Sequence, residues 1–494
     1  MTKTSTIPFH ETGYFSKTIC DYVCQEKEII EFSGAFPNLE NFKAQIVTKK
    51  KSFPSASRNV LVDALSKQYQ HISTSESTKD HIASLANENT FTVTTGHQLN
   101  LFTGPLFFLY KIISVINLAE QLKGAYPENN FVPVYWMATE DHDFEEIQYF
   151  NFKGAKMSWN RDAVGGVGRL SNEGLEVVLE EFSQHLGTSK NALKLKKLFK
   201  NSYLKHGTLT EATRFLANEL FADYGLVIVD GDDTGLKRLF IPFVEDELLN
   251  QTAHNEVLET IDKLGEHYKI QVNPREINLF YLTDGLRERI LFEDGAFKVV
   301  NTGIEFTLDE LKYELKLHPE RFSPNVIIRP LYQEVILPNL CYTGGGGELA
   351  YWFELKSYFE KVGIPFPILL LRNSAVLISE KQTKKMENLN ITTKELFLDQ
   401  QQLVNKKITE HSTVNVDFSE QRNQIDSYFK ELEEIANHTD KSFIGAVKAQ
   451  KVKQLKGLEN LEKRLLKAER RKYADIARRI KELQNEIFPK QSLQ

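Results

Sequence analysis

The sequence predicts an α/β protein whose doubly wound parallel sheet is interrupted by two insertions and followed by an α-helical coiled coil. Three observations support this fold class. Residues 91–137 read as strand, helix and strand, later short apolar runs have the composition of further strands, and the chain beyond about residue 379 has a helical pattern. A chain of 494 residues is long enough for two or three structural units.

The first strand is predicted at 91–95, the helix at 105–123, where Gly124 ends it, and the second strand at 131–137. A right-handed crossover between parallel strands leaves both carboxyl ends at one edge of the sheet. The turns after Thr95 and Met137 are therefore expected to face the same crevice.

Further strands are predicted at 225–230, 326–332 and 366–372, each near a helical pattern. The polar stretches between them do not continue a βαβ rhythm, so we interpret them as insertions. The predicted segments are 1–150 (first part of the core with an N-terminal extension), 151–220 (connecting insertion 1), 221–234 (core strand segment), 235–324 (connecting insertion 2), 325–378 (last part of the core) and 379–494 (helical coiled-coil domain).

Residues 425–487 contain glycine only at 445 and 457 and no proline, and 437–443 have the composition of a turn in a helical hairpin. From Leu458 to Ile487, apolar positions recur at spacings of three and four, which indicates a long helix with a coiled-coil seam. Residues 448–481 carry 13 basic and 4 acidic side chains, a net +9 in a chain whose total is −6. This window could be a solvated coiled-coil face or could bind RNA.

Composition excludes several classes of protein. Apolar residues make up 41% and charged residues 26%, as in ordinary soluble proteins. The most apolar stretch, 105–119, contains Lys111 and Asn117 and is too short to span a membrane. The N-terminus has no apolar segment typical of a secretory signal, so we expect a cytoplasmic protein. Three cysteines without a CxxC pair argue against a thiolate zinc site.

Three segments could carry chemistry, and the first follows the strand at 91–95. Thr103 is a plausible N-cap, with Gly104 and Pro105 in the first turn, and such a helix start suits a phosphate or carboxylate. An ordinary strand-to-helix turn is the alternative. The candidate residues here are Thr95, Gly96, His97, Gln98, Asn100, Thr103, Gly104 and Lys111.

The second segment follows the strand at 131–137 and contains Glu140, Asp141, His142 and Asp143. Carboxylates beside histidines can share protons, hold a cationic amine or bind a divalent ion. A solvated helix start rich in acids is the alternative.

In the third segment, four glycines precede Glu348, which is expected in the first turn of a helix facing a ligand. Arg329, a natural partner for a carboxylate, and Gln333 lie just upstream. A flexible surface loop is the alternative. The candidate residues of this segment are Arg329, Gln333, Gly345, Gly346, Gly347 and Glu348.

Long stretches of the sequence resemble the BshC family, the cysteine ligases of bacillithiol biosynthesis. The resemblance runs from about residue 7 to the end of the chain, and its most specific stretches are TTGHQLNLFTGP (94–105), PVYWMATEDHDFEEI (133–147), SPNVIIRPLYQEVILPNLCYTGGGGELAYW (323–352) and IFPKQSLQ (487–494). It implies a Rossmann-like core related to nucleotidylyl-transferring ligases, connecting-peptide insertions and a coiled coil that forms a homodimer. It also leads us to expect a C-terminus shorter than the family's.

The resemblance implies a reaction, the joining of the cysteine carboxyl group to the amine of glucosaminyl malate. Such a carboxyl group needs activation, so ATP with Mg²⁺ is the expected cofactor. No KMSKS-like loop follows residues 366–372, which leaves adenylation open. Although His97, His142 and Asp143 could in principle bind a metal, we expect no zinc.

We assign His97 and the Thr103–Gly104 helix start to phosphate stabilisation, and Asp141, His142 or Asp143 to holding or deprotonating the amine. Arg329 and Lys111 would hold the malate carboxylate. Because His97 and Asp141 are expected on exposed turns, His97→Ala and Asp141→Asn should abolish product formation without affecting folding. The alternative function is an RNA-binding or scaffold protein that uses the basic coiled coil on a non-catalytic core, although nucleic acid is not the partner we expect.

Overall fold

The computed structural model describes residues 3–493 and divides into two compact units. The first comprises residues 16–374, and the second comprises residues 3–15 together with 375–493. No helix in the described part of the chain is both long enough and apolar enough to cross a membrane.

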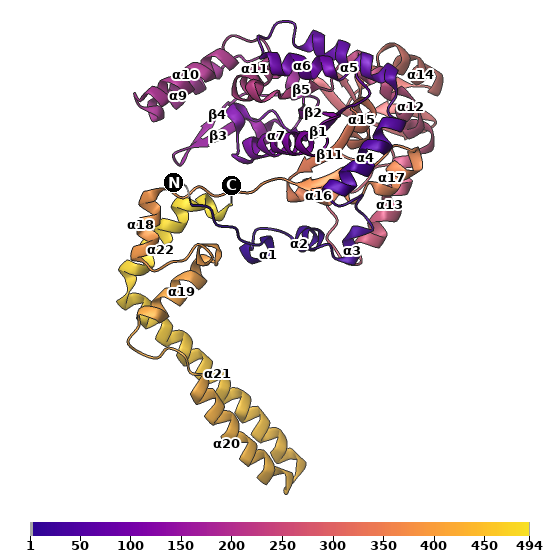
Figure 1. Cartoon of the computed structure of the whole chain (residues 1–494). Helices are drawn as coiled ribbons and strands as arrows, with labels where there is room; N and C mark the ends of the chain where they lie inside the picture. The colour runs from indigo at the N-terminus through magenta and orange to yellow at the C-terminus, as the bar shows by residue number, and fades with distance from the viewer. Residues whose placement is uncertain (1–2, 494) are drawn as a thin grey trace. The chain divides into compact units, whose positions relative to one another are not determined.

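The first unit is built around a parallel sheet with the strand order β12-β11-β1-β2-β5. Figure 1 labels β11, β1, β2 and β5 of this sheet. Its strands are β1 (Thr90–His97), β2 (Asn130–Met137), β5 (Val227–Asp230), β11 (Asn339–Gly344) and β12 (Ile368–Leu371). Counted along the chain, the order is 5-4-1-2-3, which is the doubly wound arrangement. The predicted Rossmann-like fold class is therefore confirmed, and the winding reverses between β1 and β11.

The helix α7 (Phe107–Ala125) makes the crossover from β1 to β2 and packs on both strands. Val93 on β1 and Val115 and Leu122 on α7 are fully buried in the same hydrophobic core. β1 is buried on both faces, as expected for the central strand of a parallel sheet. The register pairs Thr90 with Asn130 and His97 with Met137, so β1 and β2 end side by side.

The prediction of a strand at 326–332 was wrong. The chain instead forms helix α15 (Arg329–Ile336), and the strand is the next segment, β11. Ile327, Ile328 and Leu331 are completely buried, and a short apolar run buried on all sides does not distinguish a strand from a helix. Pro330 is compatible with a helix because it lies in the first turn.

Helices precede the sheet and follow its later strands in the same unit. They are α2 (Lys17–Cys24), α3 (Lys27–Ile30), α4 (Leu39–Ser52), α5 (Ser55–Gln68), α6 (Glu76–Ser84), α16 (Gly346–Trp352) and α17 (Lys356–Val362), and a short 3₁₀ helix η1 (Leu101–Thr103) lies between β1 and α7.

The segment between β2 and β5 is mostly helical. It contains α8 (Phe144–Ile147), β3 (Tyr149–Phe152), β4 (Ala155–Ser158), η2 (Val167–Arg169), α9 (Leu175–Leu186), α10 (Lys190–Tyr203), α11 (Leu209–Phe221) and η3 (Ala222–Tyr224). Phe102 from the sheet edge packs against Phe150, Phe182 and Phe199 of this segment.

The segment between β5 and α15 contains a second, antiparallel sheet with the order β10-β6-β7-β8-β9. Its elements are α12 (Thr234–Asn250), α13 (Thr252–Leu264), β6 (Leu279–Thr283), β7 (Leu286–Glu293), β8 (Ala296–Val299), β9 (Glu305–Phe306), α14 (Leu308–Leu317), η4 (Pro319–Arg321) and β10 (Phe322–Pro324). Both insertions form one compact unit with the central sheet, so their predicted boundaries stay predictions.

The second unit is helical. Its elements are α1 (Phe9–Thr12), α18 (Glu380–Asn388), η5 (Glu395–Phe397), α19 (Gln400–His411), α20 (Ser419–Asn437), α21 (Lys441–Lys472), α22 (Ala474–Ile487) and η6 (Pro489–Gln491). Figure 1 shows α20 and α21 side by side as a helical hairpin, and its turn falls within the predicted 437–443. The long helix expected to continue to residue 487 is broken at Tyr473, between α21 and α22.

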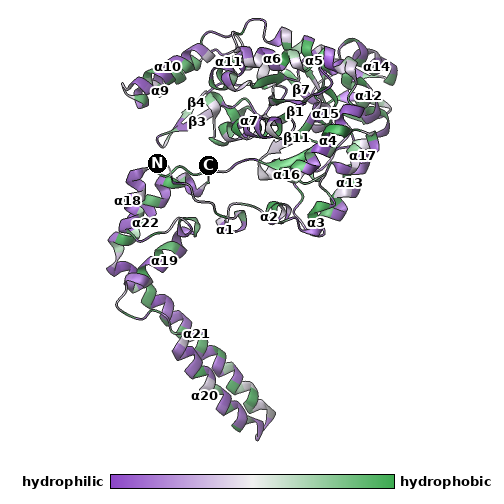
Figure 2. Cartoon of the chain, in the orientation of Figure 1, coloured by the Kyte–Doolittle hydropathy of each residue, from purple (hydrophilic) through white to green (hydrophobic). Residues whose placement is uncertain are grey.

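The hairpin has a thin apolar seam, with Phe429, Ala436 and Val447 at its centre. Figure 2 shows hydrophilic and hydrophobic stretches alternating along α20 and α21. Several basic side chains of the 448–481 window pair with acids of the same unit, Lys451 with Asp426 at 2.6 Å among them. Such pairing favours the interpretation of a solvated coiled-coil face over RNA binding.

Candidate active site

Segments with functional side chains leave the central sheet at its carboxyl edge. His97 ends β1, residues 138–143 follow β2, and residues 345–348 follow β11. Because these three strands are parallel and adjacent, the structure brings the three predicted segments to the same edge. In doubly wound folds, ligands bind at this edge, where the winding reverses.

Lys111 is the centre of a polar group at this reversal, which we call the switch-point cluster. Its Nζ is buried, donates to the carbonyl of Gly96 at 2.8 Å and lies 2.5 Å from Oε2 of Glu348. Glu348 also accepts from the Tyr342 hydroxyl at 2.6 Å and from the Gly345 amide at 2.8 Å. These contacts join the helix after β1 to the strand and helix at β11.

Two arginines complete the switch-point cluster. Arg329 donates to Oε1 of Gln333 at 3.2 Å and approaches the Tyr351 hydroxyl at 3.5 Å. Arg372, the first residue after β12, donates its backbone N–H to the Gly344 carbonyl and stacks its guanidinium over Phe107, 5.1 Å from the ring centre. Sequence reasoning missed Arg372 because the predicted strand at 366–372 included it as its last residue, whereas β12 ends at Leu371.

The electrostatics of the switch-point cluster favour an anionic ligand. Burial lowers the pKa of Lys111; Glu348 opposes this shift, whereas Arg372 and Arg329 reinforce it. Burial raises the pKa of Glu348, but Lys111, Tyr342 and the Gly345 amide outweigh burial, so its net shift is downward. A carboxylate or phosphate that entered beside Lys111 would relieve the repulsion among the three cations.

The prediction that His97 lies on an exposed turn is wrong. His97 is partly buried at the end of β1. Its ring packs against Phe107 and Phe108, with centroid distances of 5.5 and 5.3 Å. Burial, together with Lys111 and Arg372, holds its pKa well below the usual range, so the imidazole is neutral near pH 7. Its Nε2 is buried without a hydrogen-bond partner among the described residues. A neutral imidazole can donate one hydrogen bond to a ligand oxygen.

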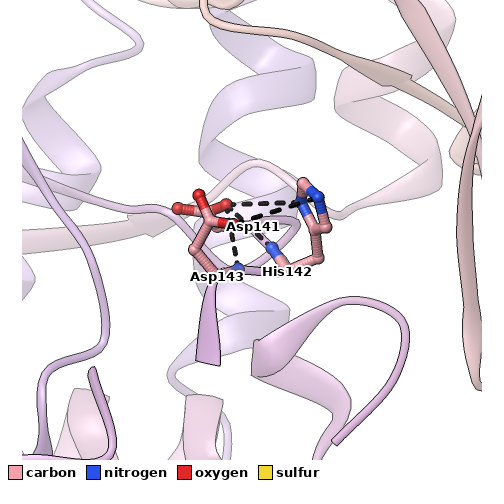
Figure 3. Close-up of side chains that lie close together, drawn as sticks. All are labelled: Asp141, His142 and Asp143. Carbon is pink, nitrogen blue, oxygen red and sulfur yellow. Dashed lines mark hydrogen bonds and ion pairs between the residues drawn. The ribbon is translucent and has the colours of Figure 1, made fainter. Parts of the chain in front are cut away.

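Asp141, His142 and Asp143 form a second group, the acidic cluster, after β2 (Figure 3). The Oδ1 atom of Asp141 accepts from the His142 amide at 2.8 Å. Its Oδ2 accepts from Nε2 of Gln98 at 2.9 Å, and the same nitrogen donates to Glu146 at 2.9 Å. Gln98 therefore ties the end of β1 to the acidic cluster.

The two carboxylates of the acidic cluster differ electrostatically. Burial raises the pKa of Asp141, but hydrogen bonds from His142 and Gln98 and the charge of Arg287 outweigh it and lower the pKa to about 2. Burial and the charge of Asp141 raise the pKa of Asp143. Asp141 is thus a permanent anion that can hold an ammonium group, and Asp143 is the better proton acceptor.

The acidic cluster has the atoms of a possible metal site, since one ligand atom from each of its three residues lies within 4.8 Å of the others. Arg287 from β7 opposes that use, because its NH1 lies 2.7 Å from Nδ1 of His142. The guanidinium donates to this nitrogen and places a positive charge where a cation would sit. Asp141 and Asp143 retain oxygens that could contact a hard ion such as Mg²⁺, so the expectations about cofactors and metals stay predictions.

With this geometry established, comparisons with known proteins identify the family. Residues 2–373 match the N-terminal Rossmann-like domain of the bacillithiol biosynthesis protein BshC, and residues 375–494 match its C-terminal coiled-coil domain. The chain belongs to the BshC family.

Similar proteins span a wide range of identity. The chain is 58% identical to a protein of Flavobacterium johnsoniae over 99% of this chain and 93% of the relative, and 56% identical to one of Christiangramia forsetii over 99% and 92%. A relative from Heliobacterium modesticaldum is 32% identical over 77% of this chain and 73% of its own. All three carry the name "Putative cysteine ligase BshC".

Thr103 does not cap a helix in this BshC-family chain. It ends the 3₁₀ helix η1, and α7 begins at Phe107 after Leu106, whose side chain makes no capping bond. The reason is the backbone, because Phe102, Thr103 and Gly104 all have positive φ and turn the chain away before the helix starts. The predicted helix start at Thr103–Gly104 is therefore wrong.

Other predicted residues hold the edge in place. The Thr95 hydroxyl is buried and donates to the Thr343 carbonyl at 2.7 Å, joining β1 to β11. Asn100 donates to the Glu146 carbonyl at 3.2 Å. Gly345 is the N-cap of α16, Gly346 begins this helix and Gly347 is exposed. Glu348 lies in the first turn of α16, as the sequence indicates.

A cavity of about 590 Å³ lies beside the end of β5, and sequence reasoning missed the residues that line it. Arg169 pairs with Asp232 at 2.8 Å and with Asp284 at 3.1 Å, and burial raises the pKa of the neighbouring Asp230. Near this cavity, the predicted Glu140 accepts from the buried Lys237 at 2.8 Å. These residues come from both insertions and the sheet, and their separation in the sequence hid them.

Proposed function

We propose that this chain is a cytoplasmic ligase that joins the carboxyl group of cysteine to the amine of glucosaminyl malate to form bacillithiol. Family membership supports the reaction class. The observation that carries the proposal is that consecutive residues at the end of β1 face groups of opposite charge. His97 lies beside Lys111 and Arg372, and Gln98 donates to Asp141.

The cationic side suits the anionic part of the reaction. Lys111 and Arg329 would hold a malate carboxylate, and Arg372 adds a third positive charge at the same switch point. A carboxyl oxygen of cysteine must leave during amide formation, and ATP with Mg²⁺ would supply a phosphate as the activating group. The neutral imidazole of His97 could then donate to a phosphate oxygen.

The acidic side suits the amine. An ammonium group would be attracted to Asp141, and its proton must be removed before the nitrogen can attack the activated carboxyl group. Asp143 would accept this proton because its raised pKa brings it closer to that of an amine than an ordinary aspartate. Arg287 occupies Nδ1 of His142, which makes His142 the weaker candidate for the base.

We also propose that two copies associate through the α20–α21 hairpin. Large apolar side chains on this hairpin are exposed in the single chain, namely Tyr428, Ile435, Phe443, Val452 and Leu461. A second copy of the hairpin would bury such residues and contribute favourable free energy.

The reaction is tested by incubating the purified protein with cysteine and glucosaminyl malate, with and without ATP and Mg²⁺, and following bacillithiol by mass spectrometry. Product that requires both substrates supports the proposal, and its dependence on ATP decides the cofactor. Asp141→Asn should abolish product. Asp294→Asn, in an exposed turn whose positive φ suits asparagine, is the matched control. Absence of product under all conditions would contradict the proposal.

A further inference from the structure

A buried ion pair between α4 and α15 lies outside the switch-point cluster and takes no direct part in the proposed chemistry. Nζ of Lys49 on α4 is 3.1 Å from Oε2 of Glu334 on α15, and the two side chains are 1% and 0% exposed. Removing two charges from water is costly, and their mutual attraction offsets this cost only when the geometry is good and the other polar atoms are satisfied.

The Glu334 carboxylate is fully engaged by the protein. Its Oε1 accepts from Nδ2 of Asn339 at 2.6 Å and from Nε2 of Gln333 at 3.0 Å. Asn339 in turn accepts from the hydroxyl groups of Thr92 and Thr94 at 3.2 and 2.8 Å. Glu334 is thereby fixed to β1, β11 and α4.

This arrangement determines which way the Gln333 amide points. An amide has a donating and an accepting end, and a carboxylate accepts only. Since Nε2 of Gln333 faces Glu334, its Oε1 faces away and accepts from NH1 of Arg329 at 3.2 Å. Gln333 is fully buried, so water does not replace these contacts.

Arg329 is the member of this chain of contacts that reaches the site. Its guanidinium lies 5.8 Å from the ring centre of Trp136 and 5.9 Å from that of Tyr342, and its charge acts on Lys111. The planar fork of arginine binds a carboxylate well only in a defined orientation.

We propose that Glu334, anchored by Lys49 and Asn339, is a positioning residue that orients the Gln333 amide so that its oxygen aligns Arg329 with a carboxylate of the substrate. The inference rests on the proposed function, because it takes glucosaminyl malate as the carboxylate-bearing ligand. Lys49 and Glu334 act through Gln333 and Arg329 and do not touch the substrate.

The test is a double-mutant cycle read by calorimetric binding of glucosaminyl malate, which does not depend on turnover. Gln333→Leu removes the contact to Arg329, and Lys49→Met combined with Glu334→Leu removes both buried charges together, so that neither is left unpaired. Each change should weaken binding by about tenfold, roughly the loss of one hydrogen bond to a charged group. In an Arg329→Ala background, neither change should weaken binding further.

A matched control removes a buried pair in the other unit, by Lys407→Met with Glu395→Gln, and should leave binding unchanged. Additive losses in the Arg329→Ala background would assign a merely structural role to the ion pair and overturn the inference. Unchanged binding in variants that keep Arg329 would also overturn it, while the proposed function would stand. A wild-type protein that does not bind glucosaminyl malate would overturn both.

Discussion

The ammonium group of Lys111 lies 2.5 Å from the Glu348 carboxylate and donates to the Gly96 carbonyl, so one side chain connects the helix after β1 to the helix after β11. This contact lies where the winding of the sheet reverses, and it brings a cation into a buried site together with Arg329 and Arg372. This contact is structural, and the binding role of Lys111 is our proposal.

Lys111→Met removes the structural contact and the proposed binding charge together. The substitution keeps an unbranched apolar side chain but removes the charge, leaving Glu348 unpaired and the ligand site less positive. We expect kcat/KM for bacillithiol formation to fall by about 100-fold, which corresponds to roughly 3 kcal/mol of lost transition-state stabilisation. Steady-state kinetics measure the effect, and Lys79→Met, which removes an exposed lysine of α6, should leave kcat/KM unchanged. An active Lys111→Met enzyme would remove Lys111 from the proposed site.

The acidic cluster predicts opposite consequences of pH for its two aspartates. The pKa of Asp141 is depressed in the folded state, so its contribution to stability is present above the ordinary value and is lost as pH falls from about 4 to about 2. This contribution of Asp141 to the free energy of unfolding is on the order of 2 kcal/mol. Urea unfolding of wild type and Asp141→Asn at pH 7 and pH 3 measures this contribution. The difference in the free energy of unfolding between the two proteins should be smaller at pH 3. An equal difference at both values would contradict the assignment.

Asp143 should determine how kcat/KM decreases at low pH. Because its pKa is raised and its base form is the ionised one, kcat/KM should fall as pH is lowered through this raised pKa. Asp143→Asn should lower the rate and remove this limb of the profile. A variant that keeps the wild-type acid limb would show that another group accepts the proton.

The sequence revealed much of the fold because β1, α7 and β2 have clear periodicities, and it revealed one edge of the site because polar residues directly follow those strands. It failed where local pattern does not determine structure. The apolar run before Arg329 resembles a strand, and three consecutive residues with positive φ after Leu101 displace the predicted helix start. Lys49 and Glu334 are far apart in the sequence, and no spacing rule indicates that they pair.

Gly104 provides a test of the unusual turn before α7. Its φ of +50° and ψ of −122° favour glycine, and a Cβ built there would lie 2.5 Å from Cβ of Asn100. Gly104→Ala should lower the free energy of unfolding by about 2 kcal/mol or more, because backbone strain and a steric clash add. Gly154→Ala is the matched control, since its φ is also positive but nothing lies within 4 Å of its Cβ. Equal losses in the two variants would show that the clash is relieved.

The coiled coil offers a test of assembly that does not involve catalysis. Ile435 on α20 is 58% exposed and Val452 on α21 is 63% exposed in the single chain. If two hairpins associate through these side chains, Ile435→Asp with Val452→Asp should convert a dimer into a monomer, since charges placed in an apolar interface must be desolvated. Sedimentation equilibrium measures the mass, and Leu377→Asp, which changes an 81% exposed leucine outside the hairpin, should leave it unchanged. A wild-type protein that sediments as a monomer, or a double variant that remains dimeric, would exclude this surface as the interface.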